Sequence, residues 1–233
     1  MSGLEIVDID RWVEENKSSF VPPVCNKLMF GAGQLKIMFI GGPNQRKDYH
    51  IEREKSPLDQ MYLHPSRIPH SPQRYGGTVG LVIERERSED EVDGLRYYVD
   101  GTIKPLWEEW FHCDDLGTQL GPVIKKSLSL YSGKVFPPPP VKIDTTTPSH
   151  PPLNLACWMV DNKEEINKRG SKVLYSRGEF KVTVWGGDVV QEGGGGDGET
   201  FLWQLKGSAE VTCDRGSGIL SRHSCTLIQA GEK

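Results

Sequence analysis

Frequent glycine and proline is the feature that most limits what this sequence can fold into. The 26 glycines and 16 prolines occupy about 18% of the 233 residues, against about 12% in an average protein. Both residues favour turns and interrupt regular structure, so the chain is expected to form many short strands rather than long helices. We therefore predict a mainly β fold with short helices.

A proline-rich segment at residues 136–153 divides the sequence into two β-rich halves. Such a composition favours extended, unpaired backbone, which is typical of a linker. We predict an N-terminal domain over residues 1–135 and a C-terminal domain over residues 154–233.

Local patterning predicts the individual elements. A helix is expected at 8–17, capped by Asp8, and the alternation of side chains predicts strands at 34–40, 78–84 and 95–99. Residues 45–54 alternate weakly, as a cavity-lining strand would, whereas the mostly charged residues 84–93 predict a solvated hairpin or loop. Apolar residues at helical spacing predict one or two short helices between 104 and 131. For the second half we expect a helix at 154–168 and strands near 171–176, 179–185, 200–205 and 208–213.

Charge and cysteine usage exclude several classes of protein. The formal net charge of −4 argues against a nucleic-acid-binding protein, which would carry a basic excess. No apolar run approaches the roughly 20 residues that span a bilayer, and the first residues lack the features of a secretory signal. The five scattered cysteines form no Cys-x-x-Cys pair and are expected to be free thiols. We expect a cytosolic protein with no membrane and no nucleic-acid partner.

Candidate metal ligands gather between residues 44 and 84. His50 lies on the weakly alternating segment, and His70 lies in a proline-bracketed turn. Side chains of a strand alternate between its faces, so Asp48, Glu52 and Glu54 share the face of His50. Two histidines with one carboxylate form the ligand set of non-haem Fe(II) oxygenases. The alternative is that these are surface histidines on loops.

Longer blocks of sequence resemble a known family. The run Arg67-Ile68-Pro69-His70-Ser71-Pro72-Gln73-Arg74 closely resembles 3-hydroxyanthranilate 3,4-dioxygenases, as do residues 22–28, 38–44, 46–52, 78–84 and 93–98. Residues 115–120 and 202–208 extend the resemblance, which is looser in the second half. The resemblance is to the animal form, in which two cupin barrels share one chain and only the first binds metal. It implies a monomeric bicupin with a catalytic N-terminal domain and a degenerate C-terminal domain.

The resemblance also implies a reaction. The family uses Fe(II) and O₂ to open the ring of 3-hydroxyanthranilate, forming 2-amino-3-carboxymuconate semialdehyde on the kynurenine route from tryptophan to quinolinate and NAD. His50 and His70 match the iron-binding histidines, and Arg46 matches an arginine beside the O₂ position. Arg74 matches the arginine that binds the substrate carboxylate, a task suited to its bidentate geometry. Glu84 matches an acid that contacts the ring substituents.

The sequence departs from the family between its two histidines. The family's carboxylate ligand falls six residues after the first histidine, where this chain has Ser56, and residues 54–60 resemble a splice across a deletion of about two to three strands. We therefore expect an incomplete N-terminal barrel, and the C-terminal domain is expected to be truncated. Glu54, four residues from His50, is the predicted substitute ligand, with Glu52 closer on the same face.

Two alternatives remain open at this point. If no carboxylate reaches the metal, the chain would be an inactive truncated isoform that acts at most as a cupin-like binding protein. A sugar-binding or isomerase cupin is the other, because fold alone does not determine function.

Overall fold

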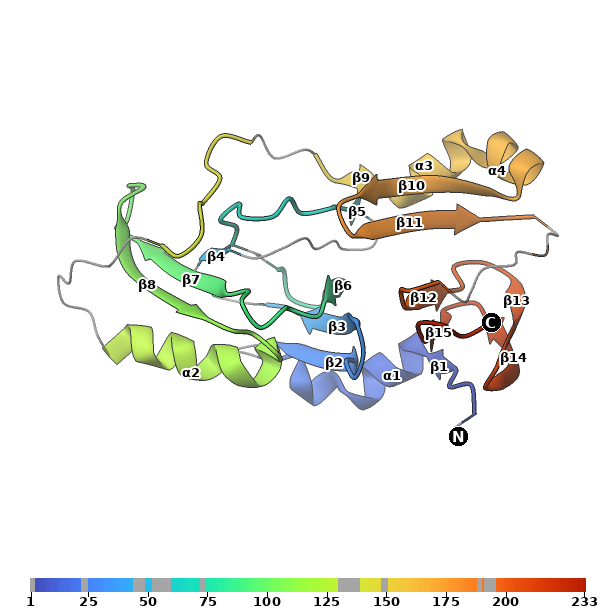
Figure 1. Ribbon diagram of the computed structural model, residues 1–233, viewed down its shortest axis with the longest axis horizontal. Helices are drawn as coiled ribbons and strands as arrows, with labels where there is room; N and C mark the ends of the chain where they lie inside the picture. Colours follow the sequence, from blue (N-terminus) through green and yellow to red (C-terminus); the bar gives the residue numbers. More distant parts are fainter. Residues whose placement is uncertain are drawn as a thin grey trace.

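A computed structural model describes residues 3–21, 25–43, 49–51, 60–71, 74–129, 139–147, 151–187, 190 and 196–233. Side chains at 49–51, 127–129 and 177 are not among the described parts. The predicted mainly β fold with short helices is confirmed (Figure 1).

Two three-stranded antiparallel sheets build the N-terminal half. The first has the order β2-β3-β6, and the second has the order β4-β7-β8. The strands of these sheets are β2 (Asn26–Phe30), β3 (Leu35–Gly41), β6 (Val79–Arg85), β4 (Tyr49–Ile51), β7 (Asp93–Tyr98) and β8 (Pro105–Phe111). Helix α2 (Leu116–Ser129) lies beside β8 and the end of β2 (Figure 1).

The C-terminal half forms smaller sheets and two short helices. The helices are α3 (Leu155–Asp161) and α4 (Lys163–Arg169), and the strands are β10 (Ser171–Arg177), β11 (Phe180–Trp185), β12 (Thr200–Trp203), β13 (Ser208–Cys213), β14 (Gly216–Ser221) and β15 (Ser224–Ile228). Strands β10 and β11 pair as one hairpin, and β13 and β14 pair as another.

Segments far apart in the sequence join the two halves. Strand β1 (Val7–Asp8) pairs with β15, which also pairs with β12, and β5 (Gln60–Met61) pairs with β9 (Leu153–Asn154). The backbone N–H of Asp144, within the proline-rich segment, donates to the carbonyl of Arg67 at 2.9 Å. Residue 144 of the predicted linker thus contacts the N-terminal half.

Alternation along β3 and β6 divides their side chains between two cores. Met38 and Val82 face an inner core that also contains residues of β7, β8 and α2. Their sequence neighbours Phe39 and Leu81 face an outer core shared with α1 (Ile9–Glu15) and β15. The sheet β2-β3-β6 is thus apolar on both faces, and its inner face is the one that concerns the candidate site.

Several local predictions are confirmed. Helix α1 begins after Asp8, whose side chain accepts a hydrogen bond from the backbone N–H of Arg11, and a 3₁₀ turn, η1 (Lys17–Ser19), follows it. Strands β3, β6 and β7 fall within one or two residues of their predicted positions. Strand β4 lies inside the predicted segment 45–54, most of which is outside the described residues.

Other predictions are wrong. The segment 104–131 does contain a helix, α2, but its first part forms strand β8 instead. Strand β8 is buried on both faces: Trp107 lies in the inner core, and Trp110 covers Gly94 on the other face. A strand buried on both faces loses its simple alternation and mimics helical spacing. The helix predicted at 154–168 is two helices with a break at Asn162. The sequence pattern predicts none of strands β2, β14 and β15.

None of the helices in the described part of the chain is long and apolar enough to cross a membrane.

Candidate active site

The side chain of Arg74 lies against the backbone of β6. A Cβ atom built on Gly80 would stand 2.1 Å from Nη1 and 2.7 Å from Cζ of Arg74. Gly80 thus leaves the space that the guanidinium occupies. Residues 74 and 75 pack equally closely on Gly42: a Cβ atom built on Gly42 would lie 2.2 Å from the carbonyl oxygen of Tyr75 and 3.0 Å from Cβ of Arg74. Burial lowers the pKa of the Arg74 guanidinium below its usual value, although arginine keeps its charge in proteins.

Gly80 and Glu84 lie on the same face of β6. They are four residues apart, and the buried Val82 between them faces the inner core. Four residues of strand span about 13 Å. The inner face of β6 therefore has a cation at one end, an apolar centre and a carboxylate at the other end.

Glu84 is held in a buried ionic network. Its Oε2 accepts a hydrogen bond at 3.1 Å from Nη2 of Arg87, which also donates at 3.0 Å to Oδ2 of Asp93. Only 3–5% of each of these side chains is exposed. The prediction of a solvated run at 84–93 is therefore wrong for these three residues, because each charge has a partner across the β6–β7 connection.

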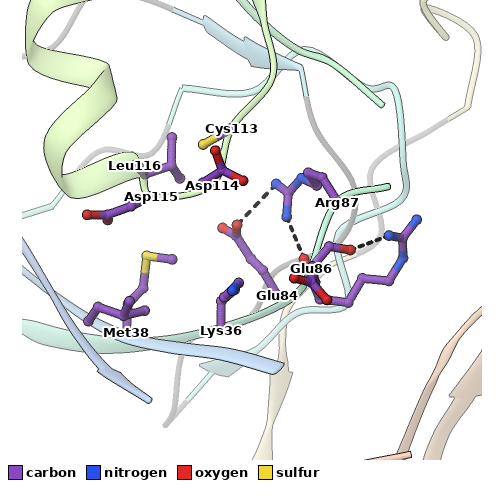
Figure 2. Close-up of a pocket in the computed structure, with 11 residues that line it drawn as sticks. Lys36, Met38, Glu84, Glu86, Arg87, Cys113, Asp114, Asp115 and Leu116 are labelled. Carbon is purple, nitrogen blue, oxygen red and sulfur yellow. Dashed lines mark hydrogen bonds and ion pairs between the residues drawn. The ribbon is translucent and has the colours of Figure 1, made fainter. Parts of the chain in front are cut away.

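A small cavity lies at the Glu84 end of this face. Figure 2 shows Glu84 directed toward Arg87, with Lys36 and Met38 of β3 on one side and Asp114 on the other. The cavity volume is about 10 Å³, which suits a single water molecule. It is too small to hold an aromatic acid, so it marks the packed end of the core.

His70 is half-buried, and its ring orientation is fixed. Its Nδ1 lies 3.2 Å from the carbonyl oxygen of Ile68. If Nδ1 carries the proton, as this bond requires, the lone pair of the ring is on Nε2. A neutral imidazole whose other N–H donates to a backbone carbonyl is the usual form of a metal ligand. The ring of buried His64 packs on it, with centroids 3.8 Å apart.

The other predicted site residues are described only in part. The backbone of His50 lies in β4, where residue 50 pairs with Leu95 of β7. Leu95 itself is fully buried in the inner core. Arg46 and Glu54 lie outside the described residues. Among the side chains that the structure describes, no three His, Cys, Asp or Glu residues gather as a metal site would require.

The structure therefore brings together some of the predicted residues. Arg74 and Glu84 share the inner face of β6, and position 50 pairs beside the same core. Sequence reasoning missed His64, Arg87 and Asp93. The alternation of side chains along a strand could have indicated that Asp93 is buried, because it shares a face of β7 with the buried Leu95 two residues later. Nothing local distinguishes Arg87 from the exposed charges around it.

Comparison with known proteins gives a consistent result. The sequence model of a family described as "3-hydroxyanthranilic acid dioxygenase" matches residues 1–58 and 57–128. The chain is 44% identical to the 3-hydroxyanthranilate 3,4-dioxygenase of Nematostella vectensis over 94% of its own length and 90% of that protein. It is 40% identical to the protein of that name from Rattus norvegicus, covering 97% of the chain and 89% of the relative. It is 39% identical to the protein of that name from Homo sapiens, over 94% of the chain and 87% of the relative.

The length of one alignment shows that the chain is shorter than a relative within the region that the two share. The Nematostella alignment spans 249 positions, more than the 233 residues of the chain. The chain therefore lacks residues that this relative has within the aligned region.

Proposed function

This chain belongs to the 3-hydroxyanthranilic acid dioxygenase family, and we propose that it opens the ring of 3-hydroxyanthranilate with O₂. Both oxygen atoms enter the product, 2-amino-3-carboxymuconate semialdehyde, as one carbon–carbon bond of the ring breaks. The product would then cyclise to quinolinate, on the route to NAD. The observation that carries the proposal is the similarity to enzymes of this name over about nine-tenths of their length.

Arg74 and Glu84 would both contact the substrate from the inner face of β6. The guanidinium of Arg74 against Gly80 offers two parallel N–H donors to the substrate carboxylate. Val82 provides an apolar surface for the ring. Glu84 would accept a hydrogen bond from the hydroxyl or amino group and hold its proton during the reaction. Arg46 would stabilise negative charge that develops on oxygen.

Fe(II) is the proposed cofactor, with His50, His70 and Glu54 as its ligands. Of these three residues, His70 is the one whose side chain the structure describes. Its Nδ1 lies against the carbonyl oxygen of Ile68, so the neutral ring would present the lone pair of Nε2 to the metal. When bound, Fe(II) supplies the one-electron chemistry that allows O₂ to react with the aromatic ring. The chain's own residues contribute binding, orientation and charge. We further propose that the protein acts in the cytosol as a monomer.

Purified protein loaded with Fe(II) tests this function directly. With 3-hydroxyanthranilate it should consume one O₂ per substrate and form the ring-opened product, followed by absorbance, and quinolinate should then accumulate. Arg74→Ala should chiefly raise KM, because the carboxylate contact is lost. Folded, iron-loaded protein that consumes no O₂ would reject the enzyme. Protein that takes up no iron would instead favour a cupin-like binding protein.

A further inference from the structure

Three buried charged groups meet where β6 leads into β7. Glu84 lies near the end of β6, Asp93 begins β7, and Arg87 lies in the connection between them. Two carboxylates thus share one guanidinium, with almost no exposure to solvent.

The contacts of Arg87 orient the hydrogen-bond donor that it offers to Glu84. Asp93 accepts two hydrogen bonds from the guanidinium, from Nε at 3.1 Å and from Nη2 at 3.0 Å. Nη1 donates at 2.8 Å to the carbonyl of Arg85. The orientation of the guanidinium is therefore set by partners on both sides of the connection, and Nη2 presents a fixed donor to Glu84 at 3.1 Å. A lysine has one nitrogen and could not keep all of these contacts.

The position of the network favours a role beyond stability. Burying charges costs desolvation energy, so a buried ion pair is weak support for stability by itself. This network lies on the face of β6 that also bears Gly80 and the Arg74 guanidinium. Arg96 and Glu108 form a second buried pair on the opposite face of β7, linked at 2.6 Å. The second pair offers a comparison with similar chemistry on the face of β7 opposite Asp93.

We propose that Arg87, oriented by Asp93, is a positioning residue that fixes the carboxylate of Glu84 toward the substrate's ring substituents. This inference rests on the proposed function. Arg87 does not contact the substrate in this account, so its effect on the reaction must act through Glu84.

Kinetic coupling between Arg87 and Glu84 tests the proposal. Arg87→Lys, Glu84→Gln and the double variant are compared as Fe(II)-loaded proteins for kcat, KM and anaerobic binding of 3-hydroxyanthranilate. We expect Arg87→Lys alone to lower kcat about 10-fold or more, as is usual for groups that orient a site residue, with a smaller change in KM. In the Glu84→Gln background the same substitution should have little further effect on kcat.

Two further variants separate positioning from folding. Arg96→Lys perturbs the comparison pair and should leave kcat unchanged in both backgrounds. Asp93→Asn preserves side-chain shape and should reproduce the kcat loss of Arg87→Lys, so it carries the test if Arg87→Lys does not fold. Additive effects of Arg87→Lys and Glu84→Gln in protein that binds substrate would overturn this inference alone. A wild-type chain that neither binds nor converts the substrate would overturn the proposed function and this inference with it.

Discussion

Gly80→Ala should weaken substrate binding without touching any charged residue. The new Cβ would stand 2.1 Å from Nη1 of Arg74, whereas ordinary contacts begin at 3.4 Å, so the guanidinium must withdraw by about 1.3 Å. A charge-assisted hydrogen bond contributes about 1.5–3 kcal/mol. Its loss corresponds to a rise in KM of roughly 10- to 100-fold. We expect kcat to change much less, because the carboxylate is remote from the bond that breaks.

Stability should change little in this variant. The backbone of Gly80 is not in the left-handed region, and the atoms that must move are the end of a flexible side chain. Replacing glycine by alanine in such a position also stabilises by about 0.4–1 kcal/mol through the unfolded chain. Thermal denaturation should therefore give a Tm close to wild type, while initial rates of O₂ uptake give KM and kcat.

The matched control for this variant is Gly76→Ala. Its new Cβ would lie 3.7 Å from the nearest atom, Cδ of Pro43, which is an ordinary contact. We expect wild-type KM for this control. An unchanged KM in folded Gly80→Ala would refute the placement of the carboxylate at the guanidinium beside Gly80. If Arg74→Ala still raised KM in that case, Arg74 would bind the substrate from another position.

Three further results are expected. His50→Ala and His70→Ala should each abolish specific Fe(II) uptake together with activity, measured as iron per chain after gel filtration; an unchanged iron content would remove that histidine from the metal site. Glu54→Gln should reduce iron affinity severely if Glu54 is the third ligand, and a mild effect in a metal titration would exclude that role. The Arg85 guanidinium lowers the pKa of Glu91 from 4.5 to about 2, so this pair stabilises the fold fully above about pH 4.5, and the stabilisation is lost as the pH falls toward 2. Denaturant unfolding of Glu91→Gln at several pH values should lack that part of the acid dependence, and an identical pH profile would contradict the assignment.

Local patterning by itself determined much of the first sheet. Strands β3 and β6 have clear apolar runs bounded by turn residues, so their positions follow from their own side chains. Glycine at position 80 is visible in the sequence too, but only the packing of Arg74 against it explains why the residue is glycine. The family resemblance likewise depends on contiguous blocks of sequence, which need no tertiary information.

Tertiary contacts decided what the sequence alone left ambiguous or misleading. Strand β8 is extended because β7 offers it a ladder of backbone partners and both of its faces are covered, a condition that no window of sequence contains. Arg87 is buried because Glu84 and Asp93 approach it from two different strands, although its neighbours in the sequence are also charged. Strand β1 pairs with β15 from the other end of the chain. Periodicity encodes which face of an element is apolar, but the partner that covers the face, or neutralises a charge on it, is set only when distant segments pack together.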